Sequence, residues 1–202
     1  KTMGINQKRS GVSWLRCLAF VVLLSLPSMA FSADASVVLS GELQPDASRV
    51  GEHVVLHLNA QIPADYHLYS MTAIEDGPMQ LKVAVTSKAL EQTGHWFAPT
   101  PHVALDKNFG KQVEYYEGEV THTCAFKVTA PLEGSKVDVV LRGQICTEAR
   151  CIPIKETIQL PLTIEPGAPR AAHTPAPKLA GEAFPPDRAA PAGATEADDS
   201  GT

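Results

Sequence analysis

The chain has 202 residues, of which 44% are hydrophobic and 19% charged, a composition typical of a globular protein rather than a fibrous or disordered one. Only 6% are aromatic, and 17 Lys and Arg stand against 22 Asp and Glu, so the formal net charge is −5. An acidic chain with few aromatic residues does not bind phosphate backbones through charge, which excludes DNA and RNA as main partners.

Residues 1–33 have the pattern of a secretory signal peptide. Basic residues precede an apolar run that ends before Pro27, namely Lys8, Arg9 and Arg16 before Cys17-Leu-Ala-Phe-Val-Val-Leu-Leu-Ser-Leu26. The run is shorter than the ~20 apolar residues of a spanning helix, which favours a cleaved signal over a membrane anchor. Cleavage after Ala30 and cleavage after Ala33 both fit the small residues that follow. We therefore expect export to an oxidising compartment, where disulfides form.

From about residue 35 to residue 164, apolar and polar residues alternate in short runs, the pattern of half-buried β-strands. In chain order these runs cover residues 37–39, 54–58, 66–71, 79–85, 113–116, 120–128, 137–145 and 158–164. In the fourth run Met79, Leu81, Val83 and Val85 are predicted to share one face. Pro161 predicts an edge strand, because proline has no N–H to donate to a ladder. Helical periodicity is absent after the signal, so residues 34–165 predict an all-β domain, a two-sheet antiparallel sandwich.

Residues 166–202 have a different composition, with 7 Pro, 11 Ala and 4 Gly among 37 residues and a single aromatic, Phe184. Such a segment buries too little apolar surface to offset the entropy lost on ordering. We predict a Pro/Ala-rich linker or a disordered C-terminal tail.

Three of the four cysteines follow the signal segment: Cys124, Cys146 and Cys151. Cys146 ends one alternating run and Cys151 comes just before the next. If residues 147–150 form a hairpin loop, the two cysteines lie opposite each other, with Cα atoms roughly 4.5–5.5 Å apart, a separation that a disulfide tolerates. Cys124 is in phase with the apolar residues of its run and is predicted to fill the core as a small hydrophobe, although the sequence also leaves open a disulfide with Cys124 in place of the Cys146–Cys151 pair.

The residues leave three uses open for the pair. The first is reversible redox chemistry, which Arg150 would favour by stabilising a thiolate if its side chain turned toward Cys151. The second is a permanent cross-link, although closing so short a loop contributes only about 2 kcal/mol. The third is a metal site, which would need Cys124 and His122 to converge on the pair.

The chain resembles a known family, the N-terminal periplasmic domain of the DsbD thiol–disulfide interchange protein. The matching stretches occur in the family's order and span most of residues 35–165: Ala64-Asp-Tyr-His-Leu-Tyr69, Asp76-Gly-Pro78, Pro101-His-Val-Ala-Leu-Asp106, Asn108-Phe-Gly110, Val113-Glu-Tyr-Tyr-Glu-Gly-Glu119 and Cys146-x₄-Cys151-Ile-Pro153. Two features depart from the family pattern: Ile154 stands where many members have a second proline, and Cys124 has no counterpart.

The resemblance implies an immunoglobulin-like sandwich with a redox-active cysteine pair, Cys146 and Cys151, shielded by a cap loop. The cap residues are Asp106, Asn108, Phe109 and Gly110, with Phe109 the ring over the sulfurs. The residues flanking the site are Tyr66, His67, Tyr69, Arg150 and Pro153. Without the resemblance, each of these residues also has an ordinary structural explanation. Asp106 could cap a turn and Phe109 could anchor a loop. Tyr69 could cover the edge of the core, and His67 could be a solvent-facing strand residue.

We therefore expect a periplasmic protein-disulfide reductase domain, monomeric and without metal or cofactor. The resemblance implies a DsbD-type membrane or thioredoxin-like electron donor, and disulfide isomerases and cytochrome c maturation factors as acceptors. Because Lys1-Thr2 precede Met3, we expect a translated fragment, so the chain is either a stand-alone protein or the exported part of a larger inner-membrane protein. Two alternatives remain: a non-catalytic interaction module with a structural disulfide, and a metal-binding or metal-tolerance protein using Met71, Met79, His95, His102 and the cysteines.

Overall fold

The computed structural model describes residues 4, 35–188 and 190–191, and the predicted signal peptide at residues 1–33 lies outside this range apart from Gly4. Within the described residues no helix is long and apolar enough to cross a membrane. The regular structure there is almost entirely β, together with the 3₁₀ turn η3 at Ala171–His173. The prediction of an all-β, immunoglobulin-like antiparallel sandwich is confirmed.

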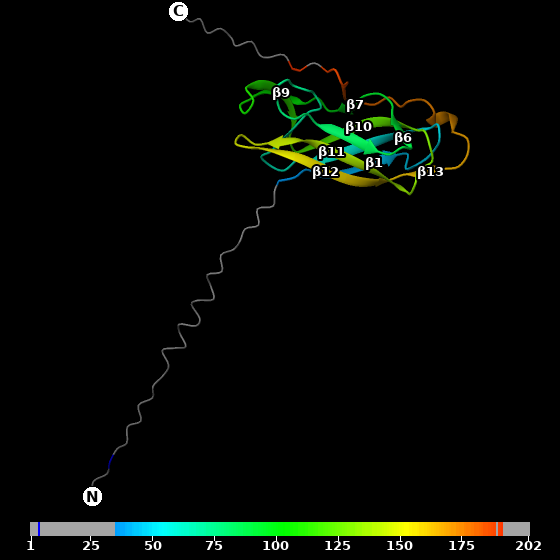
Figure 1. The fold of residues 1–202 in the computed structure, drawn as a ribbon, viewed down its shortest axis with the longest axis horizontal. Coiled ribbons are helices and arrows are strands. Elements are labelled where there is room, and N and C mark those ends of the chain that lie inside the picture. Colours follow the sequence, from blue (N-terminus) through cyan, green and yellow to red (C-terminus); the bar gives the residue numbers. More distant parts are fainter. Residues whose placement is uncertain (1–3, 5–34, 189, 192–202) are drawn as a thin grey trace, which may run out of the picture. The chain divides into compact units, whose positions relative to one another are not determined.

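The strands form two six-stranded sheets (Figure 1). The first contains, in spatial order, β1 (Val38–Gln44), β3 (His53–Gln61), β10 (Glu119–Val128), β7 (Trp96–Ala98) and β14 (Glu182–Phe184), with β6 (Leu90–Gln92) also paired to β10. The second contains β12 (Cys151–Pro161), β11 (Lys136–Cys146), β4 (His67–Tyr69), β9 (Lys111–Tyr116) and β8 (His102–Asp106), with β5 (Lys82–Thr86) also paired to β11. A separate parallel pair joins β2 (Ala47–Arg49) to β13 (Thr163–Glu165).

The main core lies between the two sheets, because both contribute their alternating apolar residues to one cluster. Strand β3 buries every second residue completely, and β11 does the same from the opposite sheet: Val54, Leu56, Leu58 and Ala60, and Val139, Leu141 and Ile145. A fully buried Leu or Ile side chain stabilises the fold by roughly 1.5–3 kcal/mol. The residues between them point to the outer faces of the sheets, and the outer face of the second sheet carries the site described below.

The prediction for Pro161 is confirmed, since β12 is the terminal strand of its sheet. The prediction that Met79 shares a face with Leu81 was wrong: the strand begins only at Lys82, and Met79 is 50% exposed at the end of a loop. In that loop Asp76 has φ of +48° and Gly77 donates its N–H to the Ile74 carbonyl, so the backbone turns where the apolar alternation suggested a strand.

Within the predicted linker or tail, residues 166–188 contact the β domain. Strand β14 adds to the first sheet beside β7, and Phe184 is buried in the main core. Arg170 donates to both carboxylate oxygens of the fully buried Glu52, at 2.8 and 2.6 Å. Arg188 reaches the buried Glu114 at 2.9 Å. Composition misses these contacts because their partners lie more than 70 residues away along the chain.

Candidate redox site

The β11–β12 hairpin brings the two predicted cysteines together. Cys146 and Cys151 are directly opposed in the ladder, with Cα atoms 4.1 Å apart and a disulfide of S–S 2.00 Å between them. The loop is closed by a hydrogen bond from the Thr147 N–H to the Arg150 carbonyl at 2.9 Å. Cys146 is fully buried, whereas Cys151 is partly exposed. An attacking molecule therefore reaches the Cys151 end of the bond first.

The pair lies on the outer face of the second sheet, away from the main core. Along β11 the odd-numbered residues up to Ile145 point inward, which turns Cys146 outward. There Cys146 forms a separate apolar cluster with Tyr69 of β4 and Val113 of β9. Four partly buried side chains pack against this cluster: Ile74, Phe109, Tyr115 and Cys151. The disulfide is thus packed in a small hydrophobic cluster that is separate from the main core.

The cap loop, residues 106–110 between β8 and β9, is held in shape by Asp106. One carboxylate oxygen of Asp106 accepts the N–H groups of Asn108 and Phe109, at 2.7 and 3.3 Å. The Gly110 N–H donates to the Asp106 carbonyl at 2.7 Å, and Gly110 has φ of +65°, a conformation that favours glycine. This turn places the Phe109 ring 6.1 Å from that of Tyr69, edge to face, against the cluster containing Cys146.

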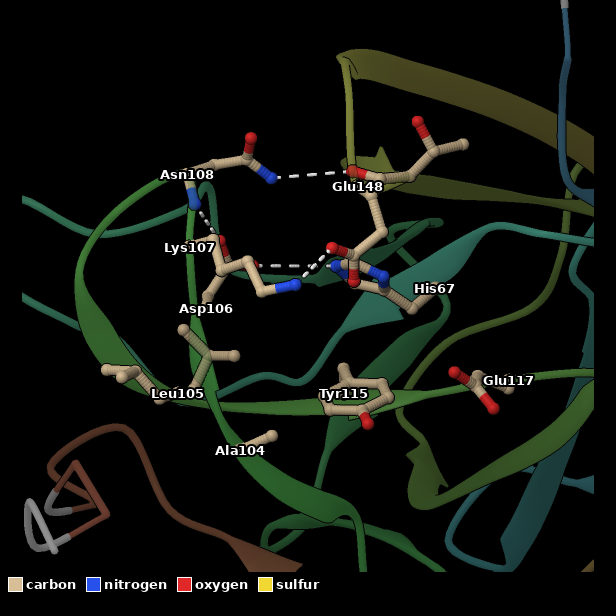
Figure 2. Close-up of a pocket in the computed structure, with 11 residues that line it drawn as sticks. His67, Ala104, Leu105, Asp106, Lys107, Asn108, Tyr115, Glu117 and Glu148 are labelled. Carbon is tan, nitrogen blue, oxygen red and sulfur yellow. Dashed lines mark hydrogen bonds and ion pairs between the residues drawn. The ribbon is translucent and has the colours of Figure 1, made fainter.

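The cap also makes two polar contacts with the cysteine hairpin (Figure 2). Lys107 forms an exposed ion pair with Glu148 at 2.7 Å, and the Asn108 side-chain amide donates to the Thr147 carbonyl at 3.4 Å. Exposed pairs of this kind contribute little to stability, because solvent screens the charges. The tip of the cap is therefore attached weakly, while its base at Asp106 is buried.

His67, Tyr69 and Asp106 form a polar group beside the disulfide. The Tyr69 hydroxyl donates to Asp106 at 2.5 Å, and His67 Nε2 lies 3.6 Å from the same carboxylate oxygen. Burial, reinforced by Asp106, raises the pKa of Tyr69 far above its usual range, so the phenol remains a neutral donor. His67 is opposite Cys146 in the β4–β11 ladder, and its ring contacts those of Tyr69 and Tyr115 at 5.0 Å each. Its side chain is only 20% exposed, so it is not a simple solvent-facing residue.

Two of the predicted flanking residues, Arg150 and Pro153, lie outside the cysteine cluster. The exposed Arg150 guanidinium donates to the Tyr66 hydroxyl at 2.6 and 3.1 Å, which directs it to Tyr66. Pro153 is exposed opposite Gln144 and does not belong to the cysteine cluster.

The ligands required for a metal site do not converge. His122 and Cys124 are buried in the main core, on the inner side of the first sheet, while Cys146 and Cys151 are bonded on the outer face of the second. Burial raises the pKa of Cys124 to about 12, as expected for the predicted small hydrophobe. Among the residues that the structure describes, no three His, Cys, Asp or Glu side chains come together as a metal site.

No role in the site was predicted for Gln144, whose side-chain amide donates to Cys146 Sγ at 3.4 Å. Its position two residues before Cys146 on a strand was the available signal, since residues i and i+2 share a face. Ile74, which packs against the cysteine cluster, was not predicted either, and no local pattern indicates its role.

A family model described as "Thiol:disulfide interchange protein DsbD, N-terminal" matches residues 36–163. A comparison with curated proteins finds no match.

Among solved structures, the N-terminal periplasmic domain of ScsB from Proteus mirabilis shares 18% identity at a TM-score of 0.48, covering 69% of this chain and 49% of that one. The reduced N-terminal domain of Neisseria meningitidis DsbD shares 17% identity at a TM-score of 0.34, and the match covers 62% of this chain and 86% of that one. The major pilin subunit BcpA of Bacillus cereus shares 11% identity at a TM-score of 0.37, and the match covers 63% of this chain and 41% of that one. The chain thus spans about half the length of the ScsB domain.

Proposed function

The chain belongs to the family of DsbD N-terminal domains, and from this premise we propose that it is a dithiol–disulfide carrier that exchanges electrons with other thiol–disulfide proteins through Cys146 and Cys151. One observation carries the proposal: the two cysteines form a disulfide whose Cys151 end is partly exposed, beneath a separate cap rather than inside the main core. A disulfide that served only to stabilise the fold would need neither a partly exposed sulfur nor a separate cap.

In the reduced protein, the Cys151 thiolate attacks a disulfide of the partner, and one partner sulfur leaves as a thiolate. The resulting mixed disulfide joins Cys151 to the other partner sulfur. Cys146, deprotonated, then attacks Cys151 Sγ and releases that second sulfur as a thiolate. Two electrons have moved to the partner, and the Cys146–Cys151 disulfide has formed. The burial of Cys146 and the partial exposure of Cys151 support this order of attack.

The cap serves to shield the pair from unsuitable thiols. Phe109 packs over the cluster that contains Cys146, and the contacts of Lys107 and Asn108 with the hairpin are weak enough for a docked partner to displace. Asp106 and Tyr69 hold the base of the cap in place while its tip opens. Gly110 gives the loop the positive φ that its turn needs.

The place of action is the periplasm, after export directed by residues 1–33. The electron donor is a DsbD-type membrane or thioredoxin-like domain, and the acceptors are disulfide isomerases and cytochrome c maturation factors. The family supports exchange with thiol–disulfide proteins as a class, and the individual partners are our proposal.

Two measurements test the function. The oxidised protein is incubated with glutathione buffers of increasing reducing power, and its free thiols are counted; a carrier reaches a measurable equilibrium. Partners are then trapped from a periplasmic extract with Cys146→Ala, in which Cys151 forms mixed disulfides that cannot be resolved. Cys124→Ala serves as the matched control, because it removes a buried thiol outside the site. A disulfide that resists the buffers, together with no adduct from Cys146→Ala or from Cys151→Ala, would instead indicate a static interaction module.

A further inference from the structure

Gln144 links the redox pair to a loop that has no role in the exchange described above. It lies on β11, two residues before Cys146 and on the same face of the sheet. Its side-chain nitrogen donates to Cys146 Sγ at 3.4 Å, and its side-chain oxygen accepts the backbone N–H of Met79 at 3.1 Å. Among the described residues, it is the one side chain with a hydrogen bond to either sulfur of the disulfide.

The second of these bonds fixes the direction of the first. The backbone N–H of Met79 can only donate, so the atom of Gln144 that meets it must be the amide oxygen. The NH₂ group is then directed to Cys146 Sγ, and an amide flip would lose the Met79 bond. The sulfur therefore faces an N–H donor whose orientation is set by the backbone.

The loop that supplies the Met79 N–H is itself well braced. Gly77 donates to the Ile74 carbonyl at 3.0 Å, and Leu81 donates to the Ser70 carbonyl at 2.8 Å. A side chain at Gly77 would place its Cβ 2.7 Å from Ile74 Cγ2, and Ile74 packs against the cluster that contains Cys146. The Asp76-Gly77-Pro78 segment thus positions both the Ile74 side chain and the Met79 N–H that binds Gln144.

Other polar groups around Cys146 are occupied elsewhere. Across the ladder, Tyr69 donates its hydroxyl to Asp106, and His67 Nε2 is directed to the same carboxylate. In the hairpin loop, Glu148 pairs with Lys107 and Arg150 with Tyr66, as described above. Tyr115 contributes its ring to the cluster.

We infer that Gln144 is a catalytic residue whose amide N–H stabilises the thiolate of Cys146; the inference rests on the proposed function and deepens it. When a donor thiolate attacks Cys151 Sγ, the Cys146–Cys151 bond breaks and its electron pair passes to Cys146 Sγ. The new thiolate accepts the Gln144 N–H. In the opposite direction, the same bond stabilises the Cys146 thiolate that attacks the mixed disulfide and expels the partner thiolate. A hydrogen bond to a charged group is stronger than one to the neutral disulfide, so the donor favours the reduced, charged state.

The test measures the pKa of Cys146 in a Cys151→Ser background, by the ultraviolet absorbance of the thiolate against pH. Gln144→Leu should raise that pKa by about one unit, roughly a tenfold fall in the thiolate-to-thiol ratio. In the protein with both cysteines it should slow reduction of the disulfide by a small thiol. Gln159→Leu is the matched control, since Gln159 is an exposed glutamine on the same hairpin that bonds to Asp138 and should change neither value.

Gln144→Glu keeps an acceptor for the Met79 N–H but turns a carboxylate oxygen toward the sulfur. It should fold like the wild type and raise the pKa of Cys146 further than Gln144→Leu does. If both variants leave the pKa and the reduction rate at the values of the Gln159→Leu control, the inference is overturned while the exchange function stands. A wild-type disulfide that fails to equilibrate with glutathione would overturn the proposed function, and the inference with it.

Discussion

His122 provides a sharp test of how the core is built. The side chain is fully buried on β10, its ring lies edge to face with Tyr116 at a centroid distance of 5.6 Å, and neither ring nitrogen has a hydrogen-bond partner in the described part of the chain. Burial lowers the pKa of His122 from 6.5 to about 4. The native state therefore contains the neutral imidazole at neutral and mildly acidic pH.

The consequence for stability follows from proton linkage. Between pH 6.5 and 4 the unfolded chain binds a proton at this residue and the folded chain does not, so the stability is complete above pH 6.5 and falls as the pH is lowered. With one pKa unit worth 1.36 kcal/mol, this residue alone should cost about 2 kcal/mol of unfolding free energy between pH 7 and pH 5. The buried glutamates act mainly below pH 4.5, so they interfere little in this window.

We expect His122→Leu, which has a similar volume, to remove that loss. At pH 7 it should also stabilise the protein by about 1–3 kcal/mol, because an unpartnered buried N–H is replaced by an apolar group. Urea unfolding at pH 7 and pH 5, with equal m-values, measures both effects. His95→Gln, at an exposed position, is the control. The reasoning would be refuted if His122→Leu and the wild type lost the same unfolding free energy between the two pH values.

Three further predictions, made with four substitutions, test the cap and the C-terminal segment. Phe109→Ala should let a small alkylating reagent reach the reduced Cys151 several-fold faster; an unchanged rate contradicts shielding by the cap. Arg188→Met leaves Glu114 buried without its cation and should cost about 3 kcal/mol in urea unfolding, while adding Glu114→Gln should restore most of it. Equal stability of the wild type and Arg188→Met would show that residues 166–188 are not anchored there. The hydrogen bonds of Arg170 lower the pKa of Glu52 to about 2, so its contribution is complete above pH 4.5 and lost as the pH falls toward 2. Glu52→Gln should therefore make the unfolding free energy depend less on pH between 4.5 and 2. The same pH dependence in the variant and the wild type would contradict the Arg170–Glu52 ion pair.

Long strands were predictable because each has enough residues to display its period. Strands β3, β10 and β11 alternate over nine to eleven residues, and the expected runs at residues 54–58, 120–128 and 137–145 lie within them. Strands of three residues, such as β6 and β7, contain too little alternation to be recognised. Met79 was misassigned because its alternation with Leu81 continues into a loop, where Gly77 and the contact with Ile74 decide the backbone path.

The contacts of residues 166–188 could not be predicted from the sequence for a different reason. Its composition describes how little apolar surface residues 166–188 can bury, and this part of the reasoning is sound. Their order comes from strand β14 with its buried Phe184, and from Arg170 and Arg188, whose buried carboxylate partners are Glu52, just before β3, and Glu114 of β9. A segment with few apolar residues can be anchored by two charge-assisted hydrogen-bond networks when the rest of the fold supplies the sites.

What the amino-acid order determined by itself is local: the strand period, the hairpin that opposes Cys146 to Cys151, and the turn chemistry of Asp106 and Gly110. These depend on residues within a few positions of one another. The surroundings of the disulfide depend on the tertiary structure, which brings Tyr69, Phe109 and Ile74 from three separate segments onto the outer face of one sheet and directs Arg150 to Tyr66. Side-chain direction at such a meeting point is set by packing between distant strands, and a single sequence carries no local signal for it.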